Sequence, residues 1–345
     1  MLIVTRRSGL RRIVRPGSLL VLAAGLFAVA LALWAIPSHE YIFLPDRAHP
    51  VAPLVRVAGG HDPDNGGGIY FVDVIIRRAT LLEQLLGGPE SGSSLYPSSE
   101  VVPTGITSAQ EANVDLSEMS TSQETAAAVA LRTLGRKVTT RNTGALVEAV
   151  EPGFPAANRL EPTDVIVAVD GKHVSSPADV EASMSGRALG SRVSFTIIRN
   201  GKDRTIALQT VPAALHSKRG IVGIYLAQNE TIKLPIRVSI DAHGIGGPSA
   251  GLAFALEVLQ QLGRNVDHGH KIAATGQIFL NGQVGPIGGI EQKTIGAREA
   301  HVDAFLVPAG QNATDARKYA HGLRIIPVKS FQQALRALAT LPKQG

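Results

Sequence analysis

The sequence predicts a mixed α/β protein in which two folded domains follow one transmembrane helix. With 345 residues, the chain is long enough for two or more compact domains. Short β-type runs alternate with helical patterns over residues 140–212 and again over residues 219–345, which is typical of α+β or α/β domains. An uncharged apolar run at residues 18–36 precedes both regions and has the length of a membrane span.

The N-terminal segment predicts a membrane anchor, with a basic tail at residues 1–17 and a span at residues 18–37. Five arginines in the tail account for five of the six excess positive charges of the chain. As a helix, the apolar residues 19–36 would extend about 27 Å, close to the ~30 Å hydrocarbon layer of a bilayer. Arginines before the span and acidic residues after it predict a single-pass protein in the cell membrane, with a cytoplasmic N-terminus and the remainder outside. A cleaved signal peptide is the alternative, because Ala-Leu-Ala at residues 30–32 would suit a signal peptidase.

The next hundred residues predict a linker followed by a strand and a helix. Residues 38–65 are rich in Pro, His, Asp and Gly, which favours a tether leaving the membrane. Residues 66–137 predict a strand at 69–76, a short helix and then a loop. The sequence SEMSTSQETAAAVALRTLG predicts a further helix that ends at Gly135.

Residues 140–212 have the pattern of a small β-rich domain. Ser176 and Pro177 predict the start of a helix, and Asn200-Gly201 between alternating apolar runs predicts a type I′ hairpin. The segment resembles a PDZ domain over its whole length, most specifically in GALVEAVEPGFPAANRLEPTDVIVAVDG.

The PDZ resemblance implies a glycine-containing loop that captures a chain-terminal carboxylate while the peptide adds as a strand. Here that loop would consist of Thr143, Gly144, Ala145 and Leu146. It departs from the apolar-Gly-apolar pattern that is usual in the family. A PDZ-like spacer without a ligand is the alternative.

GIGGPSAG, at residues 244–251, places Ser249 among glycines at the start of a helical apolar run that ends near Gly263. One interpretation is that Ser249 caps this helix, because serine is a favoured N-cap. The other is that the glycines clear space for a substrate, and the helix N-terminus favours an oxyanion at Ser249. GPSAG also fits the weak G-x-S-x-G pattern, for which Asp303 and His321 could complete a triad.

Lys293 is the candidate base for Ser249. Drawn as a helix from residue 290, the segment places Lys293 in one arc with glycines, alanines and Ile290. The side chain of a lysine on such a face either extends so that its ammonium group reaches water, or is buried with the amine away from solvent. In the second case desolvation disfavours the ammonium, and a neutral lysine next to a serine is a general base.

Three ordered motifs resemble the proteolytic domain of the Lon family over residues 219–345. They are GGPSAGLAFALEVL, AATGQIFLNGQVGPIGGIEQKTIGARE and VDAFLVPAGQNATD. The resemblance implies that Ser249 is the nucleophile, Lys293 the dyad base and Thr275 a threonine that helps to orient the dyad. An acidic residue of the family's KDGPSAG is replaced here by Gly246.

The resemblance also extends to the overall plan of the chain. Residues 66–137 resemble, more weakly, the opening strand and first helix of the same family, so the PDZ domain would be inserted in the protease domain. The plan as a whole resembles membrane-anchored PDZ and Lon-type proteases of Gram-positive bacteria, and Lon-type domains commonly form hexameric rings.

These patterns predict an ATP-independent serine endopeptidase that acts on protein or peptide substrates outside the membrane. Backbone N–H groups around Gly247 and Ala250 would hold the oxyanion. No P-loop motif occurs, and the absence of cysteine excludes disulfides, thiolate zinc sites and a cysteine nucleophile. Aromatic residues are sparse, and the chain after the basic tail is nearly neutral, so binding of nucleic acid is not expected.

No cofactor or metal is expected. His268 and His270 have no third ligand nearby in the sequence, so they are expected to lie in a solvated loop. Asp241 and His243 lie near Ser249 in the sequence, which leaves open whether they touch the site. The alternative to an enzyme is a PDZ adaptor whose Lon-like domain only oligomerises.

Overall fold

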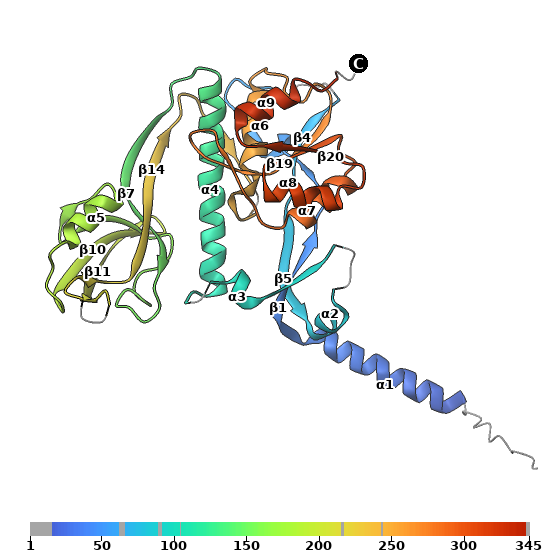
Figure 1. The fold of residues 1–345 in the computed structure, drawn as a ribbon, viewed down its shortest axis with the longest axis horizontal. Coiled ribbons are helices and arrows are strands. Elements are labelled where there is room, and N and C mark those ends of the chain that lie inside the picture. The colour runs from blue at the N-terminus through green and yellow to red at the C-terminus, as the bar shows by residue number, and fades with distance from the viewer. Residues whose placement is uncertain are drawn as a thin grey trace, which may run out of the picture.

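The computed structural model describes residues 16–61, 66–88, 92–103, 105–214, 217–242 and 244–342. Two bodies lie beside the long helix α4 (Ser108–Thr133), and a separate helix, α1 (Pro16–Ala35), projects away from them (Figure 1). One body combines segments that precede α4 with the chain from β15 (Val238–Ile240) onward, and the other is a β-rich module that a long two-stranded ribbon connects to the first.

Helix α1 covers most of the predicted span, and its side chains are described from Leu20 onward. Large apolar side chains along it are exposed, including Leu22, Phe27 and Trp34. Within the described part of the chain, no helix is both long enough and apolar enough to cross a membrane. The described residues therefore do not bear out the predicted span at residues 18–37, and the basic tail up to residue 15 lies outside them.

The predicted tether at residues 38–65 is wrong where it is described, because much of it is strand. Strand β1 pairs with β5 on one side and with β6 on the other, and the side chain of Ile42 on β1 is fully buried. The prolines and histidines of this region flank a short apolar run, YIFL, that the overall composition obscures. This sheet and its two short helices comprise β1 (Pro37–Pro45), β5 (Val74–Thr80), β6 (Ser94–Pro97), α2 (Leu81–Leu86) and α3 (Ser98–Val101).

A five-stranded sheet forms the centre of the larger body, in the order β2-β4-β16-β19-β20. The last four of these strands run parallel, and short apolar sequences such as AFLVP are buried on both faces, as expected for a parallel sheet. The strands are β2 (His49–Pro50), β4 (Gly68–Phe71), β16 (Lys271–Ala274), β19 (Ala304–Pro308) and β20 (Arg324–Val328). Helices α7 (Ile290–Glu299), α8 (Gln311–Tyr319) and α9 (Phe331–Leu338) follow in the same half of the chain.

The core of this body is shared between segments on either side of the β-rich module. Helix α6 (Gly251–Gln261) is entirely buried and packs against α4. Ile69, Val129, Phe254 and Leu306 belong to one hydrophobic cluster, although they are far apart in the sequence. Smaller elements complete this body: η1 (Ala52–Leu54), β3 (Val55–Val57), β15 (Val238–Ile240), η2 (Pro248–Ala250), β17 (Gln277–Ile278) and β18 (Val284–Gly285).

The β-rich module is built on the sheet order β11-β10-β8-β7-β14. Its predicted local features are confirmed: Ser176 Oγ accepts a hydrogen bond from the Asp179 N–H at the start of α5, and Asn200 and Gly201 both have positive φ in the hairpin. Its elements are β7 (Thr139–Val150), β8 (Val165–Val169), β9 (Lys172–His173), α5 (Pro177–Met184), β10 (Arg192–Arg199), β11 (Lys202–Gln209), β12 (Val211–Pro212), β13 (Gly220–Ile221) and β14 (Ile224–Lys233). Strands β7 and β14 pair from Val150 and Ile224 to Thr139 and Lys233, and this ribbon connects the module to the larger body (Figure 1).

Residues 219–345 expressed alone are expected not to fold, because β16 would lose its neighbour β4 and α6 would lose its packing against α4. Circular dichroism during heating should show no cooperative unfolding transition for this fragment. As a control, a chain in which two glycines replace residues 140–232 should unfold cooperatively, because Thr139 and Lys233 are already paired. A cooperative transition in the fragment alone would contradict the shared core.

Candidate active site

Ser249 lies in a single 3₁₀ turn, η2, immediately before α6. Gly247 opens this turn with φ +78°, a conformation that favours glycine. The side chain of Ser249 makes no capping hydrogen bond, and the residue that caps α6 is Ala250. The capping interpretation is therefore wrong, and the hydroxyl group is left for other partners.

Lys293 Nζ lies 2.6 Å from Ser249 Oγ, in hydrogen-bond contact. The lysine comes from the first half of α7 and is 5% exposed, which confirms that its helical face is buried. Burial lowers the pKa of Lys293 from 10.5 to about 8, because desolvation disfavours the ammonium. A substantial fraction of the amine is therefore neutral at mildly alkaline pH and can accept a proton from the serine.

Three hydrogen bonds fix the backbone around Ser249. The carbonyl of Ser249 accepts bonds from the Gly276 N–H (2.7 Å) and from Thr275 Oγ1 (3.2 Å). The carbonyl of Pro248 accepts a bond from Ser122 Oγ on α4 (2.9 Å). Thr275 is fully buried directly after β16, and its contact with Ser249 is made through the serine backbone.

Helix α4 lies directly against the glycines that precede Ser249. A side chain at Gly246 would lie 2.6 Å from Asp115 Cβ, and the Gly247 N–H donates a hydrogen bond to the Asp115 carbonyl (2.8 Å). Gly247 therefore cannot donate to an oxyanion in this arrangement, which corrects its predicted role. Burial raises the pKa of the Asp115 carboxyl group.

The other candidates from the sequence lie elsewhere. Asp303 accepts a hydrogen bond from the Lys271 N–H (2.8 Å) and pairs with His270, so the Asp303–His321 triad does not form around Ser249. His270 is buried, and its Nε2 lies 2.5 Å from the Pro342 carbonyl oxygen, which contradicts the expected solvated loop. The Asp241 N–H bonds to the Leu54 carbonyl, and His243 lies outside the described residues.

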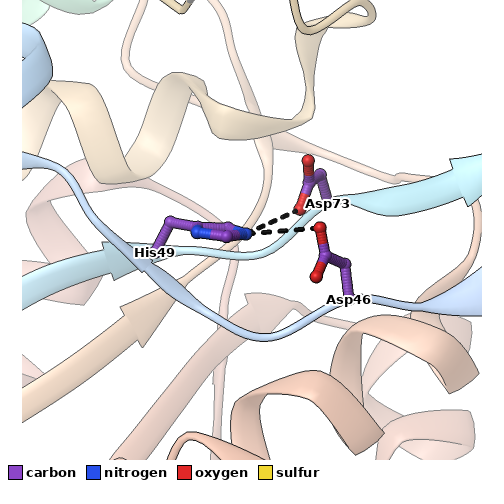
Figure 2. Close-up of side chains that lie close together, drawn as sticks. All are labelled: Asp46, His49 and Asp73. Carbon is purple, nitrogen blue, oxygen red and sulfur yellow. Dashed lines mark hydrogen bonds and ion pairs between the residues drawn. The ribbon is translucent and has the colours of Figure 1, made fainter.

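Sequence reasoning missed a cluster formed by Asp46, His49 and Asp73 near α7. His49 Nε2 lies 3.3 Å from Asp46 Oδ2 and 3.7 Å from Asp73 Oδ1, so both carboxylates face the same ring nitrogen (Figure 2). Among the described residues, these three have side chains of the kind that bind metal ions, and one possible ligand atom of each lies within 4.8 Å of the others. The hydrogen bond of His49 goes to Asp46, and the buried Oδ1 of Asp73 has no hydrogen-bond partner within the described residues. Asp73 could have been found as a residue just beyond the carboxyl end of a parallel strand, where sites commonly form.

The predicted carboxylate loop, Thr143 to Leu146, is wrong because these residues lie inside strand β7. Ala145 and Leu146 pair with β14 on one side and with β8 on the other, so their backbone groups serve the sheet. The run GALV is apolar after a single glycine, which suits a buried strand as well as a glycine-containing loop, so only the tertiary pairing distinguishes the two.

A groove lies instead between α5 and the segment that leads into β14. It has a volume of about 970 Å³, and Ala178 and Ala182 line it from α5, with Arg219 to Leu226 on the other side. Strand β14 is the outer strand of its sheet, so its second edge is open to a further strand.

The hydroxyl group of a serine that precedes a buried helix accepts a hydrogen bond from a buried lysine. This arrangement defines a site of the Ser–Lys hydrolase class. Residues 206–340 match the Lon protease (S16) C-terminal proteolytic domain, and residues 133–210 match a PDZ domain. The chain therefore carries a Lon-type serine protease domain together with a PDZ domain.

Similar proteins match parts of the chain. The Lon protease of Chloroflexus aggregans is 31% identical over 139 residues, which are 39% of this chain and 17% of that protein. Lon protease 2 of Bacillus subtilis is 35% identical over 98 residues, 28% of this chain and 17% of that protein. The chain thus spans about a sixth of the length of these relatives. The PDZ domain of an SdrC-like protein from Listeria monocytogenes aligns with 25% of this chain and 88% of its own at 21% identity, with a TM-score of 0.23.

Proposed function

We propose that the protein is a serine endopeptidase in which Ser249 is the nucleophile and Lys293 is the general base. The observation that carries the proposal is the 2.6 Å contact between Lys293 Nζ and Ser249 Oγ. The match of residues 206–340 to the Lon proteolytic domain supports it. Protein and peptide segments that can enter in an extended form are the proposed substrates.

Acylation in this proposal is a proton transfer coupled to bond formation. The neutral amine of Lys293 takes the proton of Ser249 Oγ while the oxygen attacks a peptide carbonyl. Because the Gly247 N–H is bonded to Asp115, the backbone N–H groups at Ser249 and Ala250 are the donors proposed for the oxyanion. The lysine ammonium then protonates the leaving amine, and water releases the acyl-enzyme.

A non-catalytic adaptor is the competing function. The burial of Lys293 argues against an adaptor. Removing the amine from water opposes its protonation, which costs stability, and a buried amine contributes nothing to a recognition surface. An adaptor would gain from a hydrophobic residue at position 293, whereas a protease requires the amine.

Ser249→Ala and Lys293→Arg are each expected to reduce kcat/KM for an unfolded protein such as casein by roughly 10³-fold or more. The alanine has no nucleophile, and a guanidinium stays protonated near neutral pH and cannot act as a base. Initial rates of cleavage by the purified proteins measure the effect. Lys271→Arg, at an exposed lysine in the same domain, is the matched control and should keep full activity. Equal activity of Ser249→Ala and the unaltered protein would contradict the mechanism.

We also propose that the groove between α5 and β14 binds an extended substrate segment as an added strand. Strand β14 is the outer strand of the described sheet, which leaves its second edge for an added segment, and Arg219 places a positive charge at the cavity. Binding there would raise the local concentration of substrate at Ser249.

Ala182→Arg should fill this groove and raise KM for a protein substrate by roughly tenfold. Cleavage of a short peptide blocked at both ends should not change, because such a peptide does not need the groove. Ala188→Arg, which changes an exposed alanine outside the groove, is the control. An unchanged KM for the protein substrate in Ala182→Arg would exclude the groove as a substrate site.

ATP independence, a membrane anchor, an extracytoplasmic location and a hexameric ring stay predictions from the sequence and its resemblances. Fractionation of cells that express the full chain tests the anchor and the location: recovery of the protein in the soluble cytoplasmic fraction would contradict both.

A further inference from the structure

Asp73 lies at the same edge of the central sheet as the serine and lysine. Strands β4 and β16 are parallel neighbours, with Tyr70 beside Ala273. Asp73 follows the end of β4 by two residues, and Thr275, which bonds to the Ser249 carbonyl, directly follows β16. Because the carboxyl ends of neighbouring parallel strands meet at one edge, the topology brings Asp73 to the active site.

Helix α7 presents Lys293 on the face that packs against the segments on either side of Asp73. Gly289 and Gly296 are four residues before and three residues after Lys293, so all three share one face of the helix. A side chain at Gly289 would lie 2.7 Å from Val74 Cγ2, and one at Gly296 would collide with the Asp46 carbonyl oxygen. The absence of both side chains allows the chain near Asp46 and Asp73 to lie directly on α7.

The three side chains of the cluster are partly exposed, whereas Lys293 is buried. The side chains of His49, Asp46 and Asp73 are 45%, 32% and 23% exposed, and Lys293 is 5% exposed. Asp73 Oδ1 is buried, and at 3.7 Å from His49 Nε2 it is too far away for a hydrogen bond. The hydrogen bond of Nε2 goes to Asp46.

The Asp73 carboxylate and the Lys293 ammonium act on each other electrostatically. Desolvation lowers the pKa of Lys293, and the charge of Asp73 opposes that fall. Burial is the largest cause that raises the pKa of Asp73, and the negative charge of Asp46 raises it further. The charges of His49 and Lys293 lower it. On the other side of α7, Glu291 lies close to Tyr319 of α8, where burial first and then Glu291 raise the pKa of the tyrosine hydroxyl.

We propose that Asp73 is a positioning residue whose carboxylate, held beside His49 and Asp46, is the buried counter-charge for the ammonium that Lys293 becomes when it takes the proton of Ser249. The inference rests on the proposed protease function and adds a third group to it. The proton moves from Ser249 Oγ to Lys293 Nζ as the Oγ–carbon bond forms, and Asp73 stays ionised throughout. Asp73 touches no substrate and acts through the lysine.

The test is the pH profile of kcat/KM and kcat for Asp73→Asn in the full chain, with casein or a peptide derived from it. Activity falls on the acid side of the profile, its acid limb, as Lys293 becomes protonated. Loss of the Asp73 carboxylate removes the charge that favours the ammonium, so this limb should lie at lower pH than in the unaltered protein. The plateau of kcat should fall by roughly tenfold or more, because the ammonium formed in the transition state loses its counter-charge. A residue that only maintained the fold would lower the plateau without moving the limb.

Two further variants complete the design. Glu291→Gln removes one carboxylate from the same helix, but from the face near Tyr319, and should leave the acid limb unmoved. Asp73→Glu keeps the charge and should keep the limb close to that of the unaltered protein. An acid limb that stays in place, or moves to higher pH, in Asp73→Asn would overturn the proposal.

The failure of this inference can be distinguished from failure of the protease function. If the unaltered protein shows no Ser249-dependent cleavage, the proposed function fails, and NMR titration of Lys293 still measures the effect of Asp73 directly. If Asp73→Asn does not unfold cooperatively on heating, Asp73→Ser removes the same charge with a smaller side chain. Failure of both to fold would assign Asp73 to folding and would overturn the proposal.

Discussion

The proposed chemistry depends on the burial of one amine against one hydroxyl group, those of Lys293 and Ser249. A free lysine is charged up to pH 10.5, and lowering its pKa to about 8 by burial corresponds to about 3 kcal/mol of unfavourable free energy in the folded state. This cost is fully present below about pH 8 and is relieved as the pH rises toward 10.5, because the unfolded chain then still binds a proton that the folded chain has released. The hydrophobic core around α6 must supply the stability that offsets it.

The topology brings the reacting groups together from distant parts of the chain. Ser249 lies before the buried helix α6, Lys293 lies on α7, and both are held at the carboxyl edge of the sheet that includes β4 and β16. Helix α4 supports the turn that holds Ser249 through Ser122 and Asp115, and its last turn leads into the ribbon of the β-rich module. The support of the site and the connection to the module therefore share one helix.

Much of the site could be predicted from the sequence because its signals are local. A glycine-rich turn before an apolar helix marks Ser249, and helical periodicity places Lys293 on a buried face. The strand structure within residues 38–65 was missed because prolines and histidines obscure a short apolar run. The PDZ resemblance implies a loop at residues 143–146, but a glycine followed by apolar residues also suits a strand, and the pairing that decides between them is not local. The end of a predicted strand marks Asp73 as a candidate, but its place at the edge near Ser249 depends on the pairing of strands about 200 residues apart, which no local pattern specifies.

NMR titration of the Lys293 side chain tests the central claim most directly. The ¹³Cε and ¹⁵Nζ shifts of Lys293, assigned by their loss in Lys293→Arg, would be followed against pH in the folded full chain. The account predicts a titration midpoint near the buried value of about 8. A midpoint near 10.5, the value of an ordinary lysine, would mean that the amine is charged at working pH and would contradict its role as the base for Ser249.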